Sequence, residues 1–351
     1  MLALMRLMIG QRRLLCRALV LWGLALPACQ PHRDATDASG PPPVGHYEGS
    51  ITLTGQPELR AALDIRHPSS GHYEAELTVP AAGALSFVAD TVEFSNGKLR
   101  LVRPAHPGQS LVLTLDGDFW RGSLRLDSTK AAAILVKRGV PTPSAYRVAQ
   151  VPQPTGAAWL FAPSDAGTPG AALVLMPDAE TDAAAALWAD ALAREGIIVL
   201  VLPAADSATA ATETPRLQAA LRLLRGTAGA DTANVGAWAA GARATVLAQV
   251  LATAGGPRAA FIIVQNTVID AAGRTALREL RRRKLPVLGL YGGAAAQRAA
   301  AMRNALGGRR GATVRTYRTA GADLLVPNAN GLNTRFGPGL PSGVVEWLRG
   351  Q

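Results

Sequence analysis

Imidazole and thiol groups, which most nucleophilic catalysts need, are confined to the N-terminal part of this chain. The last histidine is His106 and the last cysteine is Cys29, so residues 157–351 contain neither side chain. Hydrolysis of an ester by a serine, cysteine or aspartate nucleophile normally needs a histidine base that a carboxylate holds in place. The C-terminal half therefore cannot assemble this kind of site from its own residues.

Carboxylates offer the remaining candidate chemistry in the C-terminal half. Asp178, Glu180 and Asp182 form a cluster between an apolar run and a predicted helix. Active sites of open α/β sheets lie at such strand-to-helix turns, so metal binding or general acid catalysis is one interpretation. A charged helix start is the other, because acids are favoured near the positive end of the helix dipole.

No cofactor or metal site is expected. The sequence contains no phosphate loop, no dinucleotide-binding fingerprint and no cysteines at metal-ligand spacing. Four histidines lie near predicted strand ends and turns without a His-x-His pair. We interpret them as solvated surface residues; they are His46, His67, His72 and His106.

Arginine dominates the charge of the chain. The formal net charge is +11, and without residues 1–29, which hold four arginines and no acid, 32 bases remain against 25 acids, a charge of +7. Much of this excess lies between Arg274 and Arg318, where Glu279 is the only acid. Aromatic residues do not interleave with these arginines, so we interpret the run as a solvated basic face and expect no nucleic-acid partner.

The N-terminus has the pattern of an export signal. Arginines precede an apolar run from Ala18 to Leu26 that is too short to span a membrane as a mature helix. The run ends Leu-Pro-Ala-Cys29, which resembles a bacterial lipobox. We expect residues 1–29 to be a lipoprotein signal peptide and Cys29 to be lipidated, with an ordinary secretory peptide and an incidental Cys29 as the alternative.

Lipidation at Cys29 would anchor the chain to a lipid membrane of the bacterial cell envelope, facing the periplasm or the exterior. Residues 30–45 are polar and rich in proline, which predicts a tether between the anchor and the folded part.

Residues 46–138 predict a small all-β domain. Short runs of alternating apolar residues recur about every ten positions, separated by turn signals. Alternation marks strands with one face on a core, and eight or nine strands at this spacing favour a small barrel or sandwich. The expected strands are Tyr47–Leu53, Leu59–Ile65, Tyr73–Val79, Leu85–Val88, Val92–Phe94, Leu99–Val102, Leu111–Leu115, Trp120–Leu126 and Ala133–Val136.

Residues 139–156 are dotted with prolines and predict a linker, and in residues 157–351 strands alternate with helices. This pattern predicts a mostly parallel sheet with helices on both faces, with Ala157–Phe161 as an edge strand. Further strands are expected at Ala171–Met176, Ile197–Leu202, Val235–Trp238, Phe261–Val264, Val287–Tyr291 and Val314–Tyr317. Helices are expected at 183–194, around Leu217, Leu221 and Leu224, and near 242–254, 274–283, 296–306 and 342–349.

The segment 230–244, ADTANVGAWAAGARA, resembles the strand and turn that carry the nucleophile in α/β hydrolases of the secreted, lipoprotein-linked esterase type. The likeness extends over residues 46–351, including the β domain. The family's turn reads G-x-S-x-G, and the ungapped match puts Gly241 at the nucleophile and Arg243 at the last glycine. A register two residues earlier puts Ala239 at the nucleophile. Replacement of a glycine by Arg243 implies that the turn has relaxed.

The other catalytic positions that the resemblance implies also carry residues without the family's catalytic groups. Ala295 occupies the place of the triad acid, and the histidine falls on Asp323 or Leu324, depending on the register. Residues 177–180 replace the Gly-rich oxyanion loop. Only residues 265–285 stand where family members usually insert a helical cap.

The resemblance therefore implies a non-catalytic pseudo-hydrolase that binds an unidentified small molecule or protein. A carboxylic-ester hydrolase, esterase or lipase-like, with a displaced active site is the alternative. A third interpretation is that the β domain binds an apolar molecule in a barrel mouth while the second domain is a scaffold.

Arg243 could replace the lost site in two ways. Backbone N–H groups at a helix start favour an anion, and a guanidinium adds a planar fork for carboxylate or phosphate. Arg243 would then bind an acidic ligand in a retained pocket. Alternatively, it would pair with an internal acid such as Asp178 or Asp206 and plug the old cavity.

Overall fold

The computed structural model describes residues 40–351 apart from 90, 104–107, 127–128, 155, 206, 308–311 and 327–334. The predicted signal peptide with Cys29 lies outside the described residues, as do His106 and Asp206. Residues 41–351 form one unit of the chain. In the described part, no helix is long and apolar enough to cross a membrane.

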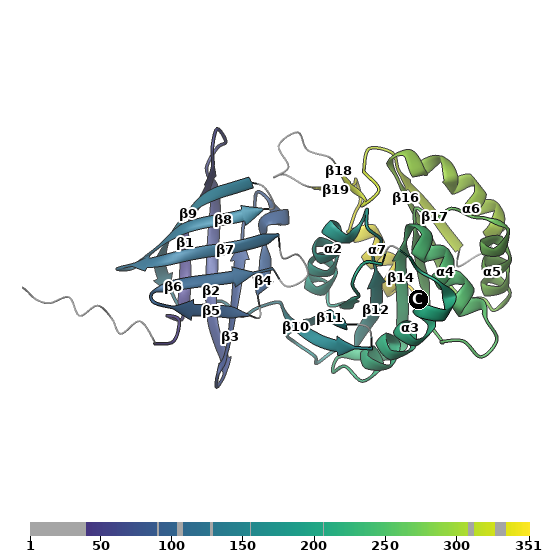
Figure 1. Cartoon of the computed structure of the whole chain (residues 1–351), viewed down its shortest axis with the longest axis horizontal. Helices are drawn as coiled ribbons and strands as arrows, with labels where there is room; N and C mark the ends of the chain where they lie inside the picture. The colour runs from purple at the N-terminus through teal and green to yellow at the C-terminus, as the bar shows by residue number, and fades with distance from the viewer. Residues whose placement is uncertain are drawn as a thin grey trace, which may run out of the picture. The chain divides into compact units, whose positions relative to one another are not determined.

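The N-terminal domain is a single antiparallel sheet that curls around one core (Figure 1). Its strands are β1 (Gly45–Leu53), β2 (Leu59–Ser69), β3 (His72–Thr78), β4 (Phe87–Ala89), β5 (Val92–Ser95), β6 (Lys98–Val102), β7 (Gln109–Asp116), β8 (Phe119–Leu126) and β9 (Thr129–Gly139), with a short helix η1 (Gly83–Leu85). The nine strands follow the order β4-β3-β2-β1-β9-β8-β7-β6-β5. One curled sheet is closer to a barrel than to a sandwich, and it confirms the all-β character of the domain.

Alternating side chains fill the concave side of this sheet. Tyr47 from β1 and Trp120 from β8 are fully buried there, and their rings meet edge to face at 6.0 Å. The described residues thus show a packed interior, which lends no support to a ligand held in a barrel mouth.

The second domain is built on an eight-stranded, mostly parallel sheet. Its strands are β10 (Tyr146–Gln153), β11 (Gly156–Pro163), β12 (Gly170–Met176), β13 (Ile198–Val201), β14 (Ala230–Ala240), β15 (Ile262–Gln265), β16 (Val287–Gly292) and β17 (Ala312–Tyr317). They follow the order β10-β11-β13-β12-β14-β15-β16-β17, and β11 runs antiparallel to both of its neighbours. This order, with its second strand reversed, is that of the α/β-hydrolase sheet.

Helices cover both faces of this sheet, as the alternation of strands and helices predicts (Figure 1). One face packs against α3 (Ala210–Arg225), α4 (Gly241–Ala252), α5 (Ala271–Arg282) and α6 (Ala299–Leu306); the other packs against α2 (Asp182–Arg194) and α7 (Ser342–Arg349). A short helix η2 (Gly293–Arg298) follows β16, and a small hairpin, β18 (Leu325–Val326) and β19 (Arg335–Phe336), precedes α7. Between β15 and β16, the described chain forms α5 and no cap.

The prolines of residues 139–156 do not make the whole segment a linker. Strand β10 lies within it and pairs with β11 along its full length. As the edge strand of the sheet, β10 tolerates Pro152, because an edge residue can forgo one ladder hydrogen bond. Ala157–Phe161, expected at the edge, is therefore part of the second strand.

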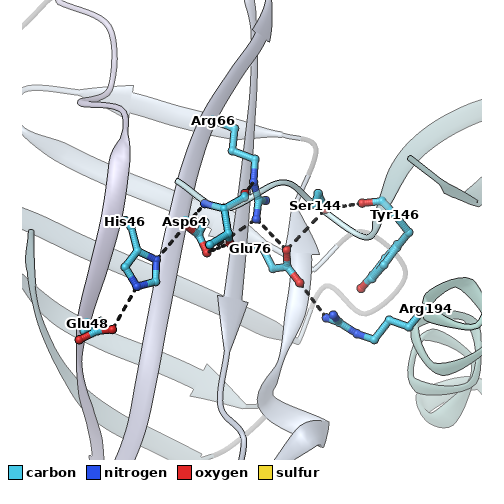
Figure 2. Close-up of polar contacts among 9 residues, drawn as sticks. His46, Glu48, Asp64, Arg66, Glu76, Ser144, Tyr146 and Arg194 are labelled. Atoms are coloured by element: carbon cyan, nitrogen blue, oxygen red, sulfur yellow. Dashed lines mark hydrogen bonds and ion pairs between the residues drawn. The ribbon is translucent and has the colours of Figure 1, made fainter. Parts of the chain in front are cut away.

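Buried carboxylates join the β domain to helix α2. Glu76 on β3 accepts hydrogen bonds at 2.9 Å from Arg66 of β2 and from Arg194 of α2 (Figure 2). Deeper in the interface, Asp190 of α2 accepts from the Arg103 guanidinium and from the Tyr146 hydroxyl. Burial lowers the pKa of Arg103 to about 10 and raises that of Tyr146 to about 12.

His46 is not the solvated residue that the sequence suggested. Its ring Nδ1 lies 2.9 Å from Asp64 and its Nε2 lies 3.3 Å from Glu48 (Figure 2). The hydrogen bond with Asp64 is the main cause that raises the pKa of His46. Asp64 in turn accepts from the backbone N–H and the hydroxyl of Thr142, both at 2.9 Å, so His46 belongs to the network that fixes the chain leaving β9.

Candidate functional site

The β14–α4 turn has kept the backbone of a nucleophile elbow. Strand β14 ends at Ala240, helix α4 begins at Gly241, and Gly241 has a φ of +55°. Ala239 lies fully buried inside the strand, so the register that places Gly241 at the nucleophile is the one the backbone supports. The expectation that Arg243 had relaxed the turn is wrong: glycine itself supplies the left-handed φ that the turn needs.

A carboxylate occupies the place of the missing nucleophile side chain. A Cβ built on Gly241 would lie 1.9 Å from Oδ2 of Asp178, which comes from the loop after β12. The other oxygen, Oδ1, accepts from the backbone N–H of Thr181 at 3.0 Å and from its hydroxyl at 2.7 Å. Asp178 thus binds the N-cap residue of α2, whose first turn holds Asp182 as the helix-start interpretation expects, and it also lies at the positive N-terminal end of α4.

A cavity of about 790 Å³ remains above Gly241. The loops that follow β12, β14, β15, β16 and β17 line it, which is where open α/β sheets bind ligands. The cavity brings Gly241 together with Ala295 and with Gly321 and Ala322. The side chains expected at the nucleophile and acid positions therefore converge on one space, but they are a hydrogen atom and a methyl group.

Asp323 and Leu324, the two candidates for the histidine position, do not line this cavity. The Asp323 carboxylate accepts from the backbone N–H of Leu325 at 3.0 Å, and its carbonyl accepts from the Trp188 indole at 3.1 Å. Burial raises the pKa of Asp323. Leu324 is fully buried, with a φ of +64°. Neither residue stands where a base could reach a substrate above Gly241.

Asn266 is a cavity residue that the sequence analysis missed. It follows β15 with a φ of +53°, and its side chain is 7% exposed. Its Oδ1 accepts from the backbone N–H of Gly292 at 2.8 Å, and its Nδ2 donates to the carbonyl of Ala322. It therefore ties together the two loops that bear the acid and histidine positions. Its sequence signal was a polar pair, Gln265-Asn266, directly after a buried strand.

Arg243 does not face the cavity, which corrects its expected role as an anion-binding residue. The side chain is 1% exposed and donates to the carbonyls of Pro177 at 2.9 Å and Pro203 at 2.8 Å. Its other nitrogen donates to Glu213 of α3 at 3.0 Å. Burial lowers the pKa of Arg243, and Glu213 opposes that shift. Arg243 thus holds these loops together from inside the domain, and its acidic partner among the described residues is Glu213 rather than Asp178.

The cavity is lined by hydrogen-bonding and charged groups, and residues 157–351 supply no imidazole to it. The charged side chains that line it are Asp178, Glu180, Asp270 and Arg298. The hydroxyl of Thr245, which also lines it, is hydrogen-bonded to that of Thr267 at 2.7 Å, with no imidazole nearby to take its proton. Across the described residues, no group of three or more His, Cys, Asp and Glu side chains is placed to hold a metal ion.

Comparison with known proteins finds likeness in the fold and none in the sequence. No protein-family model and no curated protein matches the chain. Esterase 2 from Thermogutta terrifontis, solved phosphoramylated by tabun, is 15% identical over 60% of this chain and 93% of its own, with a TM-score of 0.39.

Two further solved structures are similar at the same level. Carboxyl esterase 2 from Tuber melanosporum is 12% identical over 50% of this chain and 78% of its own, with a TM-score of 0.38. TT1662 from Thermus thermophilus is 13% identical over 59% of this chain and 98% of its own, with a TM-score of 0.42. The strand order and the elbow geometry, rather than these likenesses, carry the assignment of the fold.

Proposed function

We propose that the second domain is a pseudo-hydrolase, which binds a small molecule in the cavity above Gly241 without cleaving it. One observation carries this proposal: the Asp178 carboxylate fills the space of the nucleophile side chain, while the cavity around it remains open. A decayed site with no use would more readily fill with large apolar side chains, since protein interiors pack densely.

The absence of turnover follows from the chemistry of the lining. Acyl transfer needs a nucleophile, a base within hydrogen-bond reach and donors for the oxyanion. Gly241 and Ala295 provide no reactive group, and residues 157–351 contain no histidine. Asp178 would also repel a developing oxyanion at the start of α4, because two negative charges would then share one site.

The ligand that fits this cavity carries hydrogen-bond donors, as an amine or a polyol does. Three carboxylates, Asp178, Glu180 and Asp270, face the cavity against the single guanidinium of Arg298. Oδ1 of Asp178 is used by Thr181, and Oδ2 points toward Gly241, where a donor can approach it. An anionic ligand, one of the two alternatives that the sequence raised for Arg243, fits the same carboxylates poorly.

A thermal-shift screen of amines, polyols and carboxylates against the wild type and Asp178→Asn tests the proposal. We expect stabilisation by members of the first two classes, which the variant weakens about tenfold or more in apparent affinity, as for loss of a charge-assisted hydrogen bond. Asp178→Asn keeps the volume and the acceptor for Thr181, so it serves as its own structural control. Stabilisation by carboxylates alone would contradict the proposed ligand class.

Two activity measurements test the non-catalytic part. The purified chain should not react with a fluorophosphonate probe, and it should not hydrolyse short-chain aryl esters above background. Turnover that Asp178→Asn abolishes would replace this proposal with the alternative, a carboxylic-ester hydrolase with a displaced site. Stoichiometric labelling of any serine would do the same.

We also propose that lipidation of Cys29 holds the chain at the cell envelope. The Leu-Pro-Ala-Cys29 run supports this, and several acyl chains anchor a protein stably where one binds only marginally. In cells, Cys29→Ser should leave the membrane fraction after a wash at high salt, whereas the wild type should remain. A Cys29→Ser chain that stays with the membrane at high salt would refute the anchor.

A further inference from the structure

Six exposed arginines lie on the neighbouring helices α5 and α6 and at the end of η2, and we call this set the arginine face. They are Arg274, Arg278, Arg281, Arg282, Arg298 and Arg303. On α5 they are spaced by three to four residues, which places them on one side of the helix. The opposite side of α5, with Leu277 and Leu280, is buried in the core.

One hydrogen bond and one shared cavity place α5 and α6 side by side. Arg281 of α5 donates to the carbonyl of Leu306, the last residue of α6, at 3.4 Å. At the other end, Asp270, which caps α5, and Arg298, which precedes α6, line the same cavity. The arginine face therefore runs across both helices rather than along one.

Carboxylates of the described chain compensate little of this charge. Glu279 is the only acid between residues 271 and 307, and its carboxylate bonds to Arg282 at 2.8 Å and to Arg283 at 2.8 Å. These hydrogen bonds lower the pKa of Glu279 to about 2. The carboxylate therefore stays ionised and paired with Arg282 and Arg283. Among the described carboxylates, none forms an ion pair with Arg274, Arg278 or Arg303.

We infer that the arginine face docks on an anionic lipid surface, with guanidinium groups bound to headgroup phosphates. A guanidinium matches phosphate geometry, and clusters of four to eight bases adsorb to anionic bilayers. The inference rests on the proposed envelope anchor, because an acylated Cys29 would hold the chain at a membrane surface, where the arginine face can meet headgroup phosphates. Nucleic acid is less favoured, since neither α5 nor α6 carries an aromatic side chain for base stacking.

Vesicle co-sedimentation of the full chain with Cys29→Ser, which removes the acylation site, tests this inference. The protein should bind phosphatidylcholine vesicles only when they contain phosphatidylglycerol. Arg274→Gln, Arg278→Gln and Arg303→Gln combined should lower the partition coefficient about 100-fold, because each base near the surface contributes about a fivefold factor. Circular dichroism would show that these surface changes leave the fold intact.

A matched triple variant of exposed arginines on the β domain locates the effect. Arg60→Gln, Arg125→Gln and Arg138→Gln remove the same charge from another surface. An equal loss of binding in this control would overturn the inference, because it would show a general response to net charge. Binding to pure phosphatidylcholine, or tighter binding to a DNA oligonucleotide than to the anionic vesicles, would overturn it as well.

Salt separates this inference from the anchor on which it rests. Electrostatic docking weakens sharply in high salt, where the screening length falls to about 3 Å at 1 M, whereas an acyl anchor persists. In cells, Cys29→Ser should therefore stay with the membrane at low salt and leave it at high salt. Release already at low salt refutes the arginine face alone, and retention at high salt refutes the anchor alone.

Discussion

Positions 241 and 243, two residues apart, lie on opposite sides of the β14–α4 turn and have changed in opposite ways. At Gly241 a side chain is missing, and the carboxylate of Asp178 lies in its place beside an open cavity. At Arg243 a long side chain stands where the family pattern has a glycine, and it is fully buried against Glu213. The cavity side of the turn carries no nucleophile side chain, while the interior side carries a buried ion pair.

The difference separates the interior side of the turn, where Arg243 is buried, from the side that faces the open cavity. Arg243 connects the loops after β12 and β13 to α3, and of these only the loop after β12 also lines the cavity. Asp178, by contrast, is partly exposed and free to meet a ligand. Substitutions on one side of the turn at a time should therefore separate the two sides, with the largest loss in the free energy of unfolding expected on the interior side.

Arg243→Ala should lower the free energy of unfolding by about 3 to 5 kcal/mol, because it removes the buried partner of the Glu213 carboxylate, leaves only Arg216 paired with it, and leaves the carbonyls of Pro177 and Pro203 without this donor. Urea unfolding followed by tryptophan fluorescence measures the loss. Arg243→Met with Glu213→Leu removes both charges and should recover most of it. A double variant no more stable than Arg243→Ala would show that the hydrogen bonds to Pro177 and Pro203, rather than the ion pair, hold the loops.

Gly241→Ala should lower the free energy of unfolding by about 2 to 4 kcal/mol, since it adds a side chain at positive φ and forces it against Asp178. Combining it with Asp178→Ala removes the clash but not the backbone strain. The pair should therefore show a favourable coupling of about 1 kcal/mol or more in a double-mutant cycle. Strictly additive effects would mean that Asp178 does not lie over Gly241.

Asp178→Asn alone should change the free energy of unfolding by less than about 1 kcal/mol. The amide oxygen can still accept from Thr181, and only a charge near two helix starts is lost. The same variant should impair ligand binding, so the cavity side would separate function from stability where Arg243 does not. A loss comparable to that of Arg243→Ala would make Asp178 a structural residue.

The smallest expected effect is a pH dependence that belongs to the β domain. The folded-state pKa of His46 is raised above 6.5, so its contribution is fully present below pH 6.5 and is lost as the pH rises through the raised value. Wild type and His46→Asn should thus differ more in unfolding free energy at mildly acidic pH than at alkaline pH. A difference independent of pH would show that His46 contributes as a neutral ring.

The sequence predicted the helices and strands well where the apolar residues follow a single regular spacing. The nine strands of the first sheet and the strand–helix alternation of the second were readable because alternate or helically spaced apolar residues mark buried faces. Strand β10 was missed because Pro152 and Pro154 are typical of a linker. A strand at the edge of a sheet, where β10 lies, can contain such a proline.

The contacts of the site were harder to predict, because they join residues far apart in the chain. The sequence around Gly241 gives no indication that Asp178 fills the space of its missing side chain. The partner of Arg243 did leave a signal. Glu213 stands four residues before Leu217, on the same helix face as Leu221 and Leu224, and a carboxylate on an apolar face indicates a buried partner.

The φ of +55° at Gly241 bears on the stability of this turn. An active hydrolase holds a non-glycine nucleophile in this conformation, and the left-handed backbone costs an L-residue about 1 to 2 kcal/mol. Glycine adopts it almost freely. Glycine at position 241 therefore forms the turn without the strain that a non-glycine nucleophile would impose there, which favours stability over activity. A serine placed at position 241 would introduce that strain whether or not it gave any catalysis.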